Sequence, residues 1–162
     1  MHEVIHVIEK EIPGDFYRGL SAIDHFTSEG YLTAAAFKFD SYCAERGDQY
    51  CELSINWNDD EGALERLLTQ RKPSTDIKQF RFGYTKMSVS MLRMLFRTYI
   101  DDGKFSYERR PILADPEADI EDNPYHGNLL MDNQIGNSIR KNIQHSLATL
   151  GTSGAVINKE GK

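Results

Sequence analysis

Residues 49–57, QYCELSINW, decide the fold class, because from Cys51 to Trp57 the side chains alternate between apolar and polar. The apolar members are Cys51, Leu53, Ile55 and Trp57, and Glu52, Ser54 and Asn56 stand between them. Successive side chains of a β-strand point to opposite faces of the sheet, so this alternation predicts a strand with one buried face and one polar face. The protein is therefore expected to contain a β-sheet.

Four further segments are expected to be strands. Residues 2–12 are compatible with a strand or a short helix, and their β-branched side chains favour the strand. Residues 31–39, YLTAAAFKF, read as a strand, although the alanines at their centre would also suit a helix. Phe80, Phe82 and Tyr84 stand at alternate positions. Residues 101–113, DDGKFSYERRPIL, begin with a turn signal and continue as a strand.

Three segments predict amphipathic helices. Residues 58–73, NDDEGALERLLTQRKP, carry leucines on one helical face and end at a proline, and residues 88–99 carry a stripe of apolar side chains. Residues 135–147 place isoleucine or leucine every four residues and are followed by Gly151 as a stop. The candidate N-caps of the first two helices are Asp59 or Asp60, and Ser88 or Ser90.

The order of these segments indicates the class of fold. Strands and helices mix without a strict strand–helix–strand repeat, which is typical of an α+β domain with a largely antiparallel sheet and about three helices. With 162 residues the chain has the length of one domain. We expect a single globular domain over residues 1–151 and a flexible C-terminal tail over residues 152–162.

The composition is that of an ordinary globular protein, with 40% hydrophobic and 27% charged residues. No apolar run approaches the roughly 20 residues that span a bilayer, and the N-terminus lacks the pattern of a secretory signal, so we expect a cytoplasmic protein with no membrane contact. Cys43 and Cys51 are the only cysteines. A hairpin would bring them together, but in a reducing compartment two free thiols are the expected state.

The charge distribution is uneven. The net charge of −6 argues against general nucleic-acid binding, which depends on an excess of Lys and Arg. Residues 65–110, however, hold eleven basic and five acidic side chains, a local net charge of +6, so the remainder carries −12. This basic region is expected to face either an anionic ligand or the acidic segments of the protein itself.

Two short strings suggest metal sites, and both are incomplete. His2, Glu3 and His6 match the zinc motif H-E-x-x-H, but the string lies in a predicted strand and no third ligand is marked. The acidic loop at residues 115–126 has Ile120 where a calcium loop needs glycine, and His126 where it needs a bidentate glutamate. We therefore predict no metal site. The phosphate-binding, dinucleotide-binding and serine-hydrolase motifs are also absent, and no cofactor is indicated.

Several short motifs, taken in order, resemble a family of small uncharacterised bacterial proteins. They are FYRGL, GYLTAAAFKFD, CELSINW, FGYTKMSVSMLR and RPILADPEADIEDNPYHGNLLM, spread over about residues 16–131. The matching positions are Arg18, Ala35, Ala36, Phe37, Leu53, Ser54, Asp115, Pro116, Asn123, Pro124 and His126. Ala114 stands where the family often has histidine, and Gly127 where it has alanine. The resemblance implies no established activity, but it draws attention to residues 123–126.

Two functional hypotheses follow. The first is a small cytoplasmic interaction or accessory module that docks on a protein partner or on itself, because every catalytic template fails at a required position. The second is a protein or enzyme for a nucleotide or other phosphate ligand, with only a loose analogy to ADP-ribosyltransferases in the Arg18–Gly19 pair. In it, Arg18 with Arg93 or Arg97 holds the anion, Asn123 contributes to binding, and His126 acts as general acid or base. This second hypothesis requires Arg18, His126 and a helical arginine to share one pocket.

Overall fold

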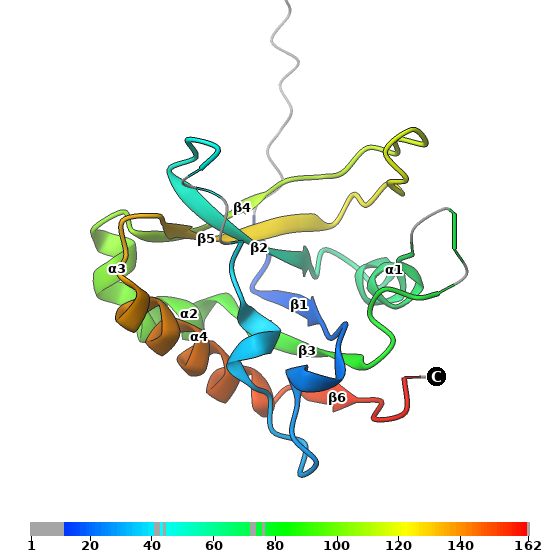
Figure 1. The fold of residues 1–162 in the computed structure, drawn as a ribbon, viewed down its shortest axis with the longest axis horizontal. Coiled ribbons are helices and arrows are strands. Elements are labelled where there is room, and N and C mark those ends of the chain that lie inside the picture. The colour runs from blue at the N-terminus through cyan, green and yellow to red at the C-terminus, as the bar shows by residue number, and fades with distance from the viewer. Residues whose placement is uncertain (1–11, 41–42, 44, 72–73, 76, 162) are drawn as a thin grey trace, which may run out of the picture.

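A computed structural model describes residues 12–40, 43, 45–71, 74–75 and 77–161. Its framework is one six-stranded sheet in the order β4-β5-β2-β1-β3-β6, with every neighbouring pair antiparallel (Figure 1). The strands are β1 (Asp15–Gly19), β2 (Tyr50–Trp57), β3 (Gly83–Ser88), β4 (Phe105–Arg109), β5 (His126–Asp132) and β6 (Ala155–Ile157). The predicted α+β class with an antiparallel sheet is confirmed.

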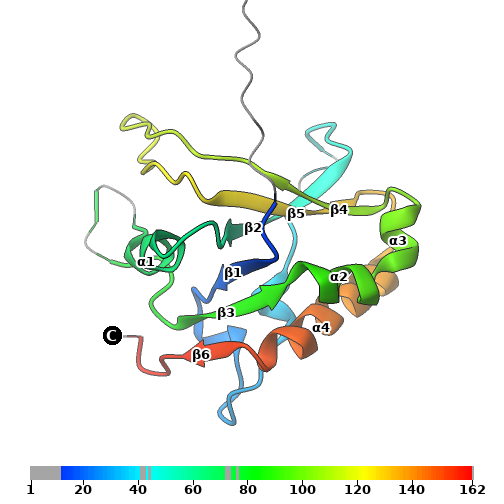
Figure 2. The same cartoon turned by 180° about the vertical axis from the view of Figure 1, so that it is seen from behind.

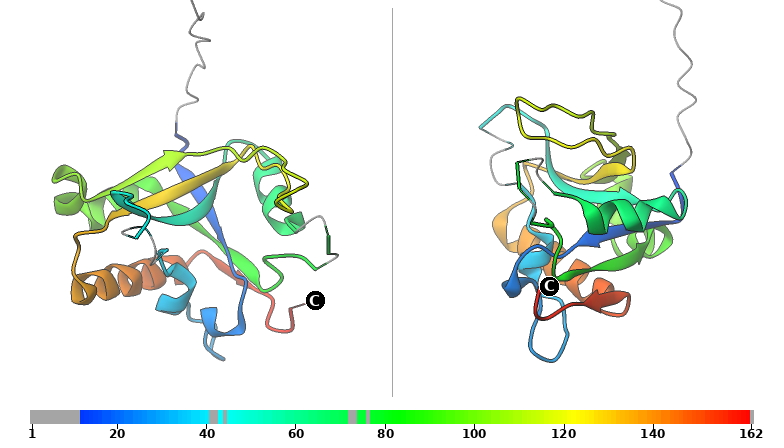
Figure 3. Two further views of the ribbon diagram at one scale, coloured as in Figure 1. Left: turned by 45° about the horizontal axis from the view of Figure 1, so that its top comes forward. Right: turned by 90° about the vertical axis from the view of Figure 1, so that its right-hand side faces the viewer.

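The helices cover the sheet unevenly. They are α1 (Gly62–Thr69), α2 (Val89–Leu95), α3 (Arg97–Asp101) and α4 (Asn137–Thr152), with short 3₁₀ turns η1 (Ile23–His25) and η2 (Ala34–Phe37). Helices α2, α3 and α4 gather at one end of the molecule and α1 lies at the other (Figure 2). In the left view of Figure 3, α4 lies beneath the strands β4 and β5, with the buried core between them. Among the described residues, no helix is long and apolar enough to cross a membrane.

The central strand β2 behaves as its sequence predicts. Its apolar residues Cys51, Leu53, Ile55 and Trp57 are each at most 2% exposed and belong to the main core. Trp57 packs edge-on against Phe16 of β1, with the ring centroids 5.7 Å apart. Pairing of β2 with β5 over residues 50–56 fixes the register of the two strands, from Tyr50 opposite Asp132 to Asn56 opposite His126.

Helix α1 covers part of the opposite face of the sheet. Its Ala63 and Leu67 form a second, small apolar cluster with Tyr17 of β1. This cover explains why Asn56, which the alternation of β2 places on the polar face, is only 2% exposed. The second face of the sheet is therefore partly buried, and the polar groups beneath α1 must find partners inside the protein.

Three sequence expectations need correction. Residues 31–39 form no strand: the three alanines lack the branched side chains that favour extended backbone, and the 3₁₀ turn η2 packs Phe37 against Gly151 of α4. The strand expected from Phe80 begins only at Gly83, because a turn precedes it and Gly83 has a φ of +110°. The helical stripe of residues 88–99 divides at Phe96, whose φ of −114° and ψ of 24° separate α2 from α3.

The expected helix caps are confirmed for α2 and wrong for α1. The side chain of Ser88 caps α2 by accepting a hydrogen bond from the backbone N–H of Met91 at 3.4 Å. The N-cap of α1 is Glu61, not Asp59 or Asp60, and its side chain makes no cap hydrogen bond, although Asp60 accepts one from the N–H of Gly62 at 2.8 Å. Helix α4 begins near the predicted position and runs one residue past Gly151. The strand expected in residues 2–12 lies outside the described residues, apart from Ile12.

The expected tail after Gly151 contains a strand instead. Residues Ala155–Ile157 form β6 and pair with β3 in the register Gly83–Ile157, Tyr84–Val156 and Thr85–Ala155. Ala155 and Ile157 also pack against the main core. The pairing supplies hydrogen-bond partners to the edge of β3, which explains why the end of the chain stays on the sheet.

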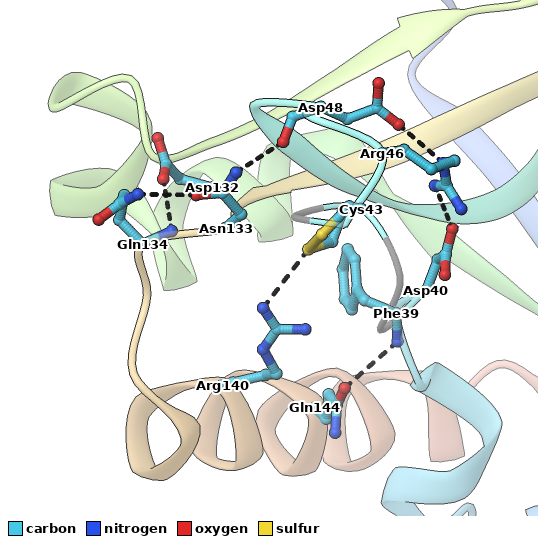
Figure 4. The surroundings of a disulfide bond; sticks show 11 residues. Phe39, Asp40, Cys43, Arg46, Asp48, Asp132, Asn133, Gln134, Arg140 and Gln144 are labelled. Carbon is cyan, nitrogen blue, oxygen red and sulfur yellow. Dashed lines mark hydrogen bonds and ion pairs between the residues drawn. A yellow bond between two sulfur atoms is a disulfide. The ribbon is translucent and has the colours of Figure 1, made fainter.

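The cysteines were expected as free thiols, but the structure joins Cys43 and Cys51 in a disulfide. A turn closed by the hydrogen bond from the N–H of Asp48 to the carbonyl of Cys43 brings their Cα atoms to 5.1 Å, a separation typical of disulfides. Figure 4 shows Arg140 of α4 reaching the disulfide, where its Nη2 lies 3.4 Å from Sγ of Cys51. The loop before β2 is thereby tied to both β2 and α4.

Candidate functional site

Arg18 on β1 is engaged by the protein itself. Its Nε donates to the carbonyl oxygen of Ala36 at 2.9 Å, and its Nη1 donates to that of Ser54 at 2.8 Å. The recorded pairing of β1 with β2 ends at Tyr17 and Asn56, so the guanidinium supplies a donor to Ser54 where the two backbones part. Burial lowers the pKa of Arg18 to about 10, which leaves it charged at neutral pH.

The sheet separates Arg18 from His126. Tyr17, Asn56 and His126 stand opposite one another on β1, β2 and β5, so their side chains share one face. Arg18, one residue beyond Tyr17, points to the other face. The single pocket that the phosphate-ligand hypothesis requires is therefore not formed by Arg18 and His126.

Asn123 and His126 do come together, around a cavity of about 100 Å³ beneath α1. Asn123 is 4% exposed, and its Nδ2 donates to Oδ1 of Asn56 at 2.9 Å. The Nδ1 of His126 lies 2.8 Å from the carbonyl oxygen of Arg110, to which its N–H donates a hydrogen bond. Burial lowers the pKa of His126, against the opposing effects of that carbonyl and of Glu108, so the neutral imidazole is favoured.

Arg93 and Arg97 line a second, open hollow of about 530 Å³ between α2, α3 and β4. The Nε of Arg93 donates to the hydroxyl of Tyr107 at 2.8 Å, and its guanidinium lies 6.0 Å from the centre of that ring. Arg97 is 83% exposed in its side chain and lies 3.9 Å from Asp101. A neighbouring hollow of about 540 Å³ also includes Arg93 and Tyr107 and extends to Gly14, so Arg93 stands at the middle of a groove.

This groove follows a strand edge. Among the described residues β4 pairs with β5 alone, at one end of the sheet. The N–H of Arg110 donates to His126 and the carbonyl of Lys104 accepts from Asp132, so even-numbered residues of this stretch turn their backbone groups toward β5. In an antiparallel pair the alternate residues face away. The N–H and C=O groups of Tyr107 and Arg109 therefore point out of the sheet.

Part of the basic region, residues 65–110, faces acidic segments of the protein itself. This was one of the two alternatives expected from the sequence. Arg66 lies 3.1 Å from Glu121, and Nη1 of Arg109 donates to Asp59 at 2.8 Å in a largely buried pair. Arg93 differs from both, because within the described part of the chain no carboxylate lies at ion-pair distance from it. Its charge remains available to an outside group.

Sequence reasoning missed Tyr107, which lines the groove beside β4, and Asn56, which lines the cavity beneath α1. Tyr107 lies in a strand that was predicted, but only the order of the strands shows that this strand is an edge. Asn56 looked like a solvent-facing residue of β2, and only the packing of α1 buries it. No local pattern marks either residue, since both depend on segments distant in the chain.

The structure bears differently on the two segments that resemble metal sites, the H-E-x-x-H match and the acidic loop at residues 115–126. His2, Glu3 and His6 lie outside the described residues. In the part of the chain that is described, no group of three or more His, Cys, Asp or Glu side chains is arranged to hold a metal ion.

Gly127 is the second residue of β5, and the structure explains why a glycine stands there. A Cβ at this position would collide with the indole nitrogen of Trp57 and the carbonyl oxygen of Glu108. Trp57 donates a hydrogen bond to that same carbonyl at 2.9 Å, so neither group has room to withdraw.

Comparison of the chain with protein-family models, curated proteins and solved structures finds no match. The resemblance to the bacterial family therefore stays a prediction, and the functional argument rests on the geometry of the two places described above.

Proposed function

We propose that this protein is an interaction module that binds an extended, acidic segment of a protein partner along the edge of β4 that no described strand covers. The observation that carries the proposal is Arg93, which has no described carboxylate partner and lies beside Tyr107, whose backbone groups point out of the sheet. Both hollows that meet at Arg93 are open enough to admit a chain.

Both the backbone pairing with β4 and the side-chain contact with Arg93 have a physical basis. An extended segment that adds to a sheet edge gains main-chain hydrogen bonds with little dependence on its sequence. Selectivity then comes from side chains next to the edge. The planar guanidinium of Arg93 suits a carboxylate that projects from the added strand, and Arg97 offers a second positive charge one helical turn away.

The test uses a short synthetic peptide in which glutamate alternates with valine, titrated into the full chain while backbone amide resonances are followed by NMR. We expect the largest shifts at Tyr107 and Arg109, with protection of their amides from hydrogen exchange. Arg93→Glu should weaken binding at least tenfold. The matched control is Arg81→Glu, because Arg81 is also exposed and has the same charge change but lies in the turn before β3 and lines neither hollow.

Two outcomes would contradict the proposal. One is binding of equal strength to a peptide in which lysine replaces glutamate. The other is protection of the amides of Tyr107 and Arg109 in the absence of any peptide, together with a dimer in solution. That result would assign the edge of β4 to self-association, which was the alternative partner expected from the sequence.

A phosphate-bearing small molecule is the second candidate, favoured by the two guanidiniums of Arg93 and Arg97 in one hollow. It no longer includes Arg18 or His126. Titration with ATP and with inorganic phosphate separates the two functions, since binding of these anions with no peptide binding would support the second.

A cytoplasmic location is likewise a proposal. Disulfides are rare in cytosolic proteins, so the state of Cys43 and Cys51 in the living cell provides a test. Free thiols at both positions would support the cytoplasm, and a persistent disulfide would favour an oxidising compartment.

A further inference from the structure

The cavity beside His126 lies on the face of the sheet opposite the main core and is separate from the groove at β4. We propose that this cavity is a binding site for a small neutral molecule that donates an N–H hydrogen bond to Nε2 of His126. An aromatic or planar primary amide is the chemical class that fits it. The assignment rests on the tautomer of His126, the neutral wall and the rigid buried amides.

The tautomer of His126 follows from its hydrogen bond to the carbonyl oxygen of Arg110. A backbone carbonyl only accepts hydrogen bonds, so the contact of 2.8 Å with Arg110 requires the proton to be on Nδ1. In the neutral ring Nε2 then carries a lone pair. Among the described residues Nε2 has no hydrogen-bond partner, and His126 lines the cavity. The site therefore presents an acceptor, which calls for a donor on the ligand.

The wall of the cavity excludes charged ligands. Among the residues that the structure describes, no acidic or basic side chain lines it apart from the imidazole, whose neutral form is favoured by burial. Leu67, Phe80 and Ile112 provide apolar surface, and Ser54 and Asn56 provide polar atoms. A mixed lining of this kind favours a flat molecule that has apolar faces and a few polar edges. An anion would lose its hydration with no cation to replace it.

The polar groups are held in place before any ligand arrives. Asn123 and Asn56 bind each other at 2.9 Å, and the Oδ1 of Asn123 accepts from the N–H of Tyr125 at 3.1 Å. Asn123 and Ile112 also exchange backbone hydrogen bonds in both directions, each at 2.9 Å. A preformed site spends little conformational entropy on binding, which favours small ligands.

The experiment compares benzamide with benzoate, which have nearly the same shape but differ in the N–H donor and the charge. Each is titrated into the full chain at pH 7.5, and the side-chain nitrogen resonances of His126 are followed by NMR. We expect benzamide to shift the Nε2 resonance and to bind at least tenfold more tightly than benzoate.

Three variants locate the binding. His126→Phe keeps a ring but removes the acceptor, and should weaken benzamide binding at least tenfold. Ser54→Trp, at an exposed position of β2, should fill the cavity mouth and abolish binding with the core intact. The control is His145→Phe, because His145 is exposed on α4 and does not line this cavity, so binding should be unchanged.

Equal binding of benzamide and benzoate would overturn the proposal, and so would benzamide binding that survives Ser54→Trp. Absence of benzamide binding to the folded wild-type chain would also overturn it. The result is independent of the function proposed for β4, because Arg93→Glu should leave benzamide binding unchanged.

Discussion

At the residue scale, Arg18 and Arg93 use the same guanidinium group in different ways. Arg18 uses its guanidinium to satisfy the backbone carbonyls of Ala36 and Ser54, which belong to segments far from it in the chain. Arg93 binds only the hydroxyl and the ring of Tyr107 in the described structure and keeps its charge at the surface. The first residue stabilises the fold, and the second is available for recognition.

Arg18→Ala should destabilise the protein by about 2 to 3 kcal/mol. The substitution removes two hydrogen bonds from a charged donor and leaves the carbonyl of Ser54 without its partner. Urea unfolding measures the change. Arg97→Ala is the control, because this exposed residue makes only a long ion pair and its loss should matter by no more than about 0.5 kcal/mol. Equal effects of the two substitutions would contradict a structural role for Arg18.

The stability of the protein should fall as the pH falls below about 6.5, the pKa of histidine in an unfolded chain. Burial lowers the folded-state pKa of His25, with a further contribution from Arg18, and burial also lowers that of His126. The unfolded chain therefore binds more protons in this range, and each histidine loses its contribution as the pH passes down through its folded pKa.

Urea unfolding at pH 7.5, 6.0 and 5.0, in the wild-type chain and in His126→Gln, measures this dependence. The variant should lose less stability across the range than the wild type. Carboxylates titrate mainly below this window, so the difference isolates the imidazole. A wild-type stability that is flat or rising between pH 7.5 and 5.0 would be inconsistent with the lowered pKa values.

At the element scale, the two edges of the sheet differ in how much backbone they leave exposed. On one side, β6 completes the sheet by pairing with β3, and its short length limits the edge that it exposes. On the other side, β4 presents the outward backbone groups of Tyr107 and Arg109 beside Arg93. Proteins usually protect a free edge or use it for binding, which is why β4 attracts the functional proposal.

Deletion of residues 155–162 should destabilise the fold by about 2 kcal/mol or more. The truncation removes β6, exposes the backbone edge of β3, and uncovers the apolar surface on which Ile157 packs. Thermal unfolding of the two chains measures the loss. Deletion of residues 160–162 alone is the control and should change little, because it leaves the β3–β6 pairing intact. A truncation at 154 with unchanged melting would restore the tail interpretation.

At the scale of the whole molecule, the disulfide connects three separate parts. Cys43 lies in the loop after η2, Cys51 is the second residue of β2, and Arg140 of α4 contacts the sulfur of Cys51 (Figure 4). Gln144 of α4 also accepts a hydrogen bond from the N–H of Phe39, at 3.3 Å. The loop, the sheet and the long helix are thus joined at one place in the core.

Reduction of the disulfide should lower the free energy of unfolding by about 2.5 kcal/mol, because an unfolded chain gains the freedom of a loop closed over eight residues. For a protein of this size the melting temperature should fall by roughly 5 to 10 °C. Thermal unfolding with and without dithiothreitol measures the effect. The double variant Cys43→Ser, Cys51→Ser is the control and should not respond to the reductant. Reaction of both thiols in the untreated native protein would contradict the bond.

The fold and the candidate sites were predictable to different degrees. The strand β2, the helices α1 and α4 and the strand β4 were visible because periods of two and of about 3.6 residues are local properties. The strand β6 and the turn η2 were not, since each depends on a distant neighbour, β3 in one case and α4 in the other. Arg93 was a candidate from its helical position, but its setting beside a strand edge depended on the order of the strands.

The sequence by itself determined that this protein is an α+β domain built on an antiparallel sheet, because alternating and helical patterns reflect how each segment divides between core and solvent. Only the tertiary structure decided which residues meet. It placed Arg18 and His126 on opposite faces, buried Asn56 under α1, brought Cys43 to Cys51 and set the edge of β4, which no described strand covers, beside Arg93. These outcomes depend on strand order and register, which arise from contacts between segments far apart in the chain.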